Sequence, residues 1–287
     1  MTTSRLHLLL AAGLGVCLAQ VICPLESIAA VKVDPLPYER LGILRLPTVR
    51  EPSGICYHSI RKTLFVVDDS GLVCEFRPDG GIVRQKQIRS ADFEGITHDP
   101  GTGLLYIAVE GDETILEVDP DVLQVKREFA VPRTFQGKTV MKKGGQGLEA
   151  IAFVPDREHP HGGTFFVANQ SFDLQAADDI SAVFEVEVPL KAKDTGPGTV
   201  KILRCIQAPV VDISGLHWNA QRSILYAISD ATDRLMACTR IGEAIQFWTL
   251  PGDNQEGITV APDGVMYIAQ DSGGVLKLKV DWTRMQK

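Results

Sequence analysis

Five copies of one short pattern recur along the chain, and this repetition restricts the possible folds more than any other feature. Each copy has a Gly or Ala, then a large aliphatic residue, and then a strand with alternating apolar side chains. The copies are residues 51–55, 92–96, 147–151, 212–216 and 254–258. Two more apolar strands follow every copy, and a fourth follows the first four copies. Such repetition predicts an architecture in which one structural unit recurs and each unit packs on its neighbours.

The spacing of the repeats gives the size of one unit. Gly54 and Gly95 of the first two copies lie 41 residues apart. Four short strands within such a length, with Gly, Pro and Asp at the turns, are typical of one blade of a β-propeller. The two middle repeats are longer because of the loops 133–147 and 172–180. We therefore predict an all-β fold, a five-bladed β-propeller.

The two ends of the chain are expected to complete one blade together. The last repeat reaches the C-terminus after three strands, whereas residues 41–46 form an apolar strand ahead of the first repeat. This N-terminal strand is predicted to complete the last blade, which closes the ring and leaves few exposed sheet edges. A two-sheet sandwich explains short strands but not five copies of one motif. Residues 31–287 are therefore interpreted as a single propeller domain.

Residues 1–30 have the pattern of a secretory signal. Arg5 precedes an apolar run over residues 8–21, and small residues follow at 27–30. This order is typical of a signal peptide, with cleavage after Ala29 or Ala30. The run is also nearly long enough to remain as an uncleaved membrane anchor. In both cases the protein is predicted to be exported, periplasmic or extracellular, and to meet the membrane only through this leader.

Charge and cysteine spacing argue against several classes of function. The formal net charge of −7 argues against a surface for nucleic acid or for anionic membranes. Cys17 and Cys23 fall in the leader, and the other four cysteines lack Cys-x-x-Cys spacing, so no zinc or redox motif is present. We expect small buried thiols. A disulfide between Cys205 and Cys238 is the alternative in an oxidising compartment.

Two columns of polar residues emerge when the repeats are aligned. In a propeller the first strand of each blade lines the central channel, and the second strand runs antiparallel beside it. The start of the first strand and the end of the second are therefore predicted to face the same mouth of the channel. The first-strand column is Ser53, Glu94, Glu149, Ser214 and Glu256. The second-strand column is Asp69, Glu110, Gln170, Asp230 and Asp271.

Seven carboxylates around one opening would repel one another, and a hard cation would relieve that repulsion. Unit charges about 4 Å apart interact by roughly 4 kcal/mol at intermediate dielectric. Calcium accepts six to eight oxygens in flexible geometry, and columns without His or Cys suit calcium better than zinc. The predicted metal ligands are Glu94, Glu149, Glu256, Asp69, Glu110, Asp230 and Asp271, with Gln170, Asn169 and Glu51 as further binding residues.

Turn chemistry is the alternative explanation of these polar residues. Asp, Asn and Gly after a strand are common turn formers, and the second-strand column alone fits that explanation. The columns do not say which subset would touch an ion. In the long loop of the third blade, Asp173, Asp178 and Asp179 either cap the same mouth or form an exposed acidic loop.

Residues outside the columns give weaker signals. His58, His98 and His217 lie on first strands at different offsets from the aligned glycine, so we expect packing or channel lining rather than a ring. Ser53 and Ser214 lack a Gly-x-Ser-x-Gly elbow, which argues against a serine hydrolase. An aromatic column on the second strands predicts packing between blades. Its members are Tyr106, Phe166, Tyr226 and Tyr267.

The repeated motifs resemble the SdiA-regulated (YjiK-like) family of bacterial β-propellers, which are distantly related to NHL-repeat proteins. The resemblance covers roughly residues 38–282. It rests on residues 51–55 with 64–69, 92–96 with 109–110, 147–151 and 254–258. What the resemblance implies is a five-bladed propeller that carries a calcium site and has no settled biochemical activity.

Two classes of function remain open. In the first, the protein is a non-catalytic, monomeric calcium-binding propeller whose acidic face recognises an unknown protein, an envelope component or a small molecule. In the second, the ion is catalytic, as in the six-bladed paraoxonase and gluconolactonase families, and a lactone, ester or phosphoester is hydrolysed. Fold similarity does not transfer activity. The first class is favoured because no dedicated base or nucleophile stands outside the acidic columns.

Overall fold

The computed structural model describes residues 32–143, 145–174, 179–191 and 198–286. The predicted leader, residues 1–30, and Asp178 fall outside this part of the chain. Within it, regular structure is β-strand apart from one turn of 3₁₀ helix, η1 (Arg284–Gln286). No helix of the described residues is long and apolar enough to cross a membrane.

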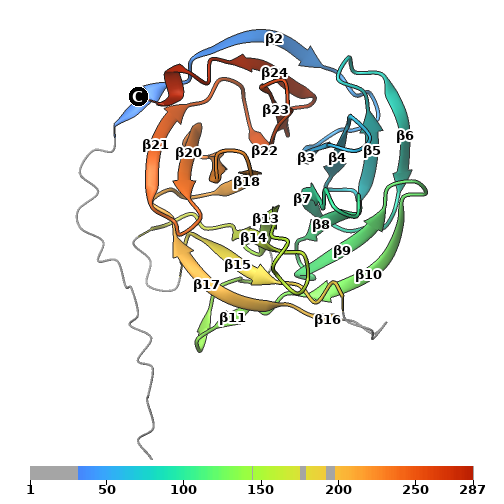
Figure 1. Ribbon diagram of the computed structural model, residues 1–287, viewed down its shortest axis with the longest axis vertical. Helices are drawn as coiled ribbons and strands as arrows, with labels where there is room; N and C mark the ends of the chain where they lie inside the picture. The colour runs from blue at the N-terminus through green and yellow to red at the C-terminus, as the bar shows by residue number, and fades with distance from the viewer. Residues whose placement is uncertain (1–31, 144, 175–178, 192–197, 287) are drawn as a thin grey trace, which may run out of the picture. The chain divides into compact units, whose positions relative to one another are not determined.

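Five sheets follow one another around a central channel, each forming one blade (Figure 1). The first blade is β3 (Pro52–His58), β4 (Thr63–Asp68), β5 (Leu72–Phe76) and β6 (Ile82–Gln87). The second is β7 (Phe93–His98), β8 (Leu105–Val109), β9 (Thr114–Asp119), β10 (Gln124–Ala130) and β16 (Gly198–Thr199). The third is β13 (Leu148–Pro155), β14 (Gly163–Asn169), β15 (Ala182–Glu187) and β17 (Lys201–Gln207).

The remaining strands form two more blades and one small hairpin. The fourth blade is β18 (Ile213–Asn219), β19 (Ile224–Ser229), β20 (Arg234–Thr239), β21 (Ala244–Thr249) and β1 (Val33–Pro35). The fifth is β22 (Gln255–Val260), β23 (Val265–Gln270), β24 (Val275–Val280) and β2 (Tyr38–Leu44). A hairpin of β11 (Thr134–Phe135) and β12 (Lys138–Thr139) lies in the long loop before the third blade. The predicted five-bladed propeller is confirmed.

The N-terminal strand closes the ring as predicted. β2 pairs antiparallel with β24, so that Tyr38 lies opposite Val280 and Leu44 opposite Val275. The strand begins three residues before the predicted start and ends at Leu44, and Leu46 packs instead into the core beside the first blade. The parallel fifth strands β1 and β16 were not predicted. They are three and two residues long, too short to carry a recognisable pattern.

The repeated glycine is required because the innermost strands approach one another closely around the channel. A β-carbon on Gly95 would lie 2.7 Å from the Ile151 amide nitrogen, and one on Gly257 would lie 2.7 Å from the Ser53 carbonyl oxygen. The channel at this level holds a cavity of only about 10 Å³, lined by the glycines, the equivalent Ala150, the aliphatic residues that follow them, and Ser214. Such a volume admits at most a single water molecule. The glycines therefore form a closed waist that separates the two mouths of the channel.

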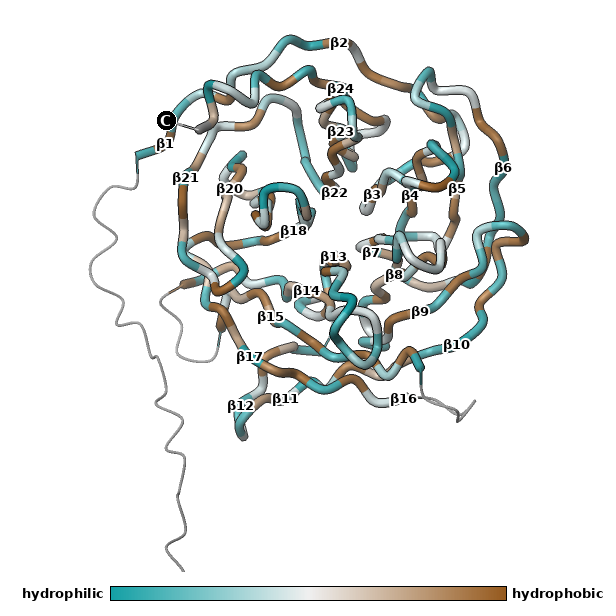
Figure 2. Tube along the Cα trace, in the orientation of Figure 1, coloured by the Kyte–Doolittle hydropathy of each residue, from teal (hydrophilic) through white to brown (hydrophobic). Residues whose placement is uncertain are grey.

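Hydrophobic contacts lie between neighbouring blades, and Figure 2 shows hydrophobic residues spread over all five of them. One core cluster joins Tyr106 of the second blade to Ile151 of the third, and another joins Tyr226 of the fourth to Ile268 of the fifth. The predicted packing of the aromatic column between blades is confirmed: its four rings are buried, Tyr106, Tyr226 and Tyr267 lie in core clusters that join two blades, and Phe166 contacts Trp218 of the next blade. The four described cysteines are free, as expected, and only Cys205 is not fully buried.

Another column, which sequence analysis missed, pairs buried glutamates with arginines. The glutamates lie on the third strands of the first three blades, and each faces an arginine on the fourth strand. The opposed pairs are Glu75 with Arg84, Glu117 with Arg127 and Glu185 with Arg204. Each of the three pairs also forms a salt bridge. Buried carboxylates of this kind need such partners, because an uncompensated buried charge is strongly destabilising.

Candidate functional site

Recurring backbone hydrogen bonds bring the two polar columns together at one end of the channel. In four blades, the residue after the second strand donates its amide hydrogen to a carbonyl two residues before the first-strand column. These bonds run from Glu110 to Asp92 (3.0 Å), Gln170 to Gly147 (3.2 Å), Asp230 to Asp212 (3.1 Å) and Asp271 to Asn254 (2.9 Å). Both columns therefore border one opening, which we call the acidic mouth.

The accepting residues of these bonds form a third column that adds carboxylates to the acidic mouth. It places Asp92 and Asp212 beside the predicted residues, and sequence analysis missed both of them. Asp212 and Asn254 have φ angles of 53° and 50°, values that Asp and Asn tolerate better than most residues. The available signal was their position three residues before the aligned glycine, a column that also contains Glu51.

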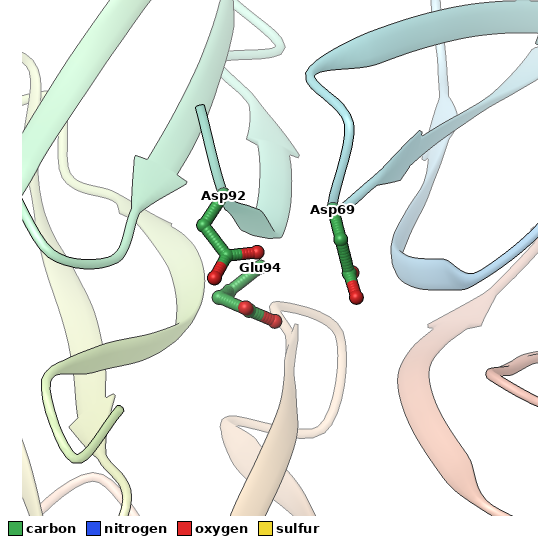
Figure 3. Close-up of side chains that lie close together, drawn as sticks. All are labelled: Asp69, Asp92 and Glu94. Atoms are coloured by element: carbon green, nitrogen blue, oxygen red, sulfur yellow. The ribbon is translucent and has the colours of Figure 1, made fainter. Parts of the chain in front are cut away.

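Three carboxylates at the acidic mouth lie close enough to share one cation (Figure 3). Asp69, Asp92 and Glu94 each offer an oxygen, and these oxygens all lie within 4.8 Å of one another. Asp69 follows β4 of the first blade, whereas Asp92 and Glu94 flank the start of β7 of the second. The Ser53 hydroxyl donates a hydrogen bond to Asp69 Oδ1 and so fixes one side of this carboxylate. We call these three residues the carboxylate triad.

Glu149 presents a buried oxygen without a partner on the adjacent blade. Glu149 is only 5% exposed, and its Oε2 has no hydrogen-bond partner among the described residues. Oε1 accepts a long hydrogen bond of 3.4 Å from Gln170 Nε2, which also donates to Asp212 Oδ1 at 3.1 Å. A buried carboxylate oxygen with no donor is costly unless a proton or a cation satisfies it.

Burial and mutual repulsion raise the pKa values of several mouth carboxylates. Burial, followed by repulsion from Glu149, Asp92 and Asp69, raises the pKa of Glu94 well above its ordinary value. Burial and the charges of Glu110 and Glu256 do the same to the pKa of Glu149.

Burial and neighbouring charges also raise the pKa values of Glu256 and Asp69. Burial and the nearby Asp230 and Asp212 raise the pKa of Glu256 to about 8. Burial raises the pKa of Asp69 to about 6, although the hydrogen bond from Ser53 lowers it. The mouth therefore retains protons near neutral pH when nothing else balances its charge.

The other predicted site residues differ in the hydrogen bonds and charges that surround their carboxylates. Burial raises the pKa of Glu110, and a hydrogen bond of 2.9 Å that its Oε1 accepts from the Gly147 amide, together with the charge of Arg133, offsets part of this shift. Asp230 and Asp271 border Glu256, since both contribute to its raised pKa. Glu51 is exposed at the rim, and its charge contributes to the raised pKa of Asp69.

Asn169 and Asp179 are engaged within the third-blade loop. Asn169 Nδ2 donates to the Ile180 carbonyl at 2.6 Å, and its Oδ1 accepts from the Ala182 amide at 3.0 Å. Asp179 is buried, and its Oδ2 accepts hydrogen bonds from the amides of Phe172 (3.0 Å) and Asp173 (3.2 Å). Both side chains thus shape the loop, and neither turns a free group toward an ion.

The three histidines on first strands lie at the end of the channel opposite the carboxylates. Glu94 follows Phe93 at the start of β7, and His98 ends the same strand. Four residues of extended strand separate Glu94 from His98, which corresponds to about 13 Å. His58 and His98 do stack on each other, with ring centroids 4.7 Å apart. Their different offsets therefore did not prevent contact between neighbouring blades.

Known proteins resemble this chain in sequence motif and in fold. The SdiA-regulated family model matches residues 45–272. None of the curated proteins matches the chain.

Two solved structures resemble the chain at low sequence identity. A glutaminyl cyclase from Myxococcus xanthus has 12% identity and a TM-score of 0.58, over 86% of this chain and 99% of the cyclase. The β-propeller domain of Myceliophteria thermophila Cps50 (Swd1) has 12% identity and a TM-score of 0.49, over 85% of this chain and 100% of that domain. The cyclase likeness shows the fold alone, whereas the family match covers most of the sequence: the chain belongs to the SdiA-regulated family.

Proposed function

We propose that this member of the SdiA-regulated family binds a calcium ion at the acidic mouth and serves as an exported binding module. The observation that carries the proposal is the carboxylate triad beside the unpartnered Oε2 of Glu149. Three carboxylate oxygens that converge from two blades, next to a buried oxygen that lacks a donor, form an arrangement that a cation would stabilise.

The donor chemistry favours calcium among the common cations. Asp69, Asp92 and Glu94 supply hard carboxylate oxygens, and no His or Cys belongs to either polar column. Asp69 is exposed and the other two are half-buried, so a bound ion would keep contact with solvent. Calcium tolerates mixed ligands and water in irregular geometry, whereas magnesium needs a near-ideal octahedron. We propose that the three triad carboxylates bind the ion directly and that the charges of Glu149 and Glu256 stabilise the bound ion.

A recognition role fits the surroundings of this site better than catalysis. A hydrolase would need a base near the ion, and the channel histidines lie about 13 Å along the strand from the triad level. The closed waist separates them further. Any hydrolytic step would have to use the mouth carboxylates themselves as base. The glutaminyl cyclase shares the fold at 12% identity, which gives no reason to assign its activity here.

The partner is proposed to be an unknown protein, an envelope component or a small molecule that approaches the acidic mouth. Phosphate-rich nucleic acid is disfavoured, because the chain carries a net charge of −7 and the mouth gathers carboxylates. A bound calcium ion would give such a partner a positive centre to contact with its own oxygen atoms. We propose that the chain acts as an exported monomer and meets the membrane only if the leader is retained.

Thermal unfolding tests the ion. The purified protein is unfolded in chelator, in calcium and in magnesium, and its melting temperature is compared. Binding to the folded state alone stabilises it by about 2.7 kcal/mol at a ligand concentration of 100 Kd. A calcium-selective rise in melting temperature supports the proposal, and the absence of a shift at millimolar calcium opposes it. A screen of lactones, esters and phosphoesters with the calcium-loaded protein then tests the catalytic alternative.

A further inference from the structure

The mouth opposite the carboxylates holds a cavity of about 110 Å³ walled by aromatic and imidazole rings. We call it the ring pocket. Its rings belong to Tyr57, His98, Phe153, His217 and Trp218, which come from four of the five blades. Thr97 and Thr259 line it as well, together with aliphatic residues. Among the described residues that line it, none is Asp, Glu, Lys or Arg.

The walls of the ring pocket are held in place by contacts behind them. His58 is buried, donates from Nε2 to the Gly103 carbonyl oxygen at 2.8 Å, and stacks on His98. The Ser59 amide donates to His98 Nε2 at 3.2 Å, so the neutral His98 ring carries its proton on Nδ1. Phe153 packs edge-on against Phe165 with ring centroids 4.9 Å apart. The pocket is therefore formed before any ligand arrives.

Three polar side chains around the ring pocket lack hydrogen-bond partners among the described residues. The His217 ring, the Trp218 indole N–H and the Tyr57 hydroxyl make no hydrogen bond with any described residue, and all three residues line the cavity. By contrast, the Thr97 and Thr259 hydroxyls already accept hydrogen bonds from the amides of Phe153 and Tyr57. Donor and acceptor capacity thus remains at the rings, where an uncharged molecule could satisfy it.

The lining also excludes a charged ligand. No cation or anion among the lining residues would compensate a buried charge. Burial lowers the pKa of His98 to about 3 and that of His217 to about 4, so both imidazoles are neutral near pH 7. A cavity of about 150 Å³ in another protein admits benzene. The ring pocket encloses somewhat less, but it opens to solvent at the exposed residues Pro100 and Ala220, so one ring can lie inside it with its polar group in the opening.

We infer that the ring pocket binds a small, uncharged, planar molecule, a single aromatic or heteroaromatic ring with an amide-like donor and acceptor. The ring of Phe153 would cover one of its faces, and His217 and Trp218 Nε1 would pair with its polar group. This site is independent of calcium, since the waist between the two mouths holds a cavity of only about 10 Å³.

Benzamide and benzoate test the inference, because they share one shape and differ in charge. Their binding to the full protein is measured by ligand-observed NMR titration and by quenching of tryptophan fluorescence. We expect saturable binding of benzamide and at least tenfold weaker binding of benzoate. His217→Ala should weaken benzamide binding about tenfold, the effect of one lost hydrogen bond. Trp218→Phe, which keeps a ring but removes the N–H, should weaken it to a similar extent and abolish the quenching.

Trp282→Phe is the matched control. Trp282 Nε1 donates to the Gly264 carbonyl at 2.8 Å and does not line the pocket, so this variant should bind benzamide normally. The inference is overturned by absence of saturable benzamide binding up to its solubility limit, or by equal affinity for benzoate. Unchanged affinity in Trp218→Phe would also overturn it. Because Trp218→Phe keeps an aromatic ring in place, it provides the test if His217→Ala does not fold.

Discussion

Removing the arginine that faces a buried glutamate should strongly destabilise the propeller. The Glu117 side chain on β9 is 2% exposed, and Arg127 on β10 donates to it from Nε at 3.0 Å. Arg127→Met keeps most of the aliphatic contact of the arginine but leaves the carboxylate buried. Its remaining donor is the Tyr106 hydroxyl at 3.2 Å.

The size of the effect follows from this burial. Breaking a buried ion pair by removing one partner costs about 3–5 kcal/mol. Arg127 is 21% exposed, so some water can reach the vacated position, and we expect the lower end, about 3 kcal/mol. In a domain of this size that corresponds to a fall in melting temperature of roughly 6–12 °C.

Urea unfolding and calorimetry of three variants test this reasoning. Lys126→Met, an exposed position on the same strand, controls for the loss of a positive charge and should stay near the wild type. Glu117→Leu combined with Arg127→Met should recover much of the lost stability, because an apolar pair replaces the ion pair. A loss in Arg127→Met no larger than that in Lys126→Met would refute the argument.

Three further predictions follow from the waist and the acidic mouth. Gly257→Ala should lower the free energy of unfolding by about 1–3 kcal/mol, because its β-carbon would meet the Ile55 nitrogen and the Ser53 oxygen at 2.7 Å; unchanged urea unfolding would contradict the closed waist. In chelator, stability should fall as pH rises from about 4.5 to about 8, because folded Glu256 holds a proton that the unfolded chain has released. Glu256→Gln should flatten that slope in urea unfolding, and an unchanged slope would count against the assigned cause. Asn169→Ala should lower the melting temperature without changing calcium affinity, since its amide is bonded within the third-blade loop.

The repeat made most of the fold predictable, and the geometry of its glycines shows why. Positions 54, 95 and 257 are glycine because the neighbouring backbone leaves no room for a β-carbon. This packing constraint recurs from blade to blade and is therefore visible as a period in the sequence. The closing strand was predictable because the last blade lacked one. The parallel strands β1 and β16 depend on contacts between distant segments and are too short to show a pattern.

The acidic mouth was only partly predictable for a different reason. Alignment on the glycine placed Glu94 and Asp69 at one opening, but Asp92 lies directly before β7, at a position that is Asp, Asn, Glu or Gly in different blades. Its closeness to Asp69 depends on how two blades meet, which repeat spacing does not encode. The salt bridges of Glu75, Glu117 and Glu185 were missed because an alternating strand usually places a charge on its exposed face.

Calcium binding to the carboxylate triad is the most direct test of the account. Equilibrium dialysis of the chelator-treated protein against radioactive calcium measures the affinity of the wild type, Asp92→Asn and the control Glu39→Gln, whose side chain is exposed on the outer strand β2. We predict one calcium site, at least tenfold weaker in Asp92→Asn and unchanged in Glu39→Gln. Absence of calcium binding, or equal affinity in wild type and Asp92→Asn, would contradict the assignment of the ion to this mouth.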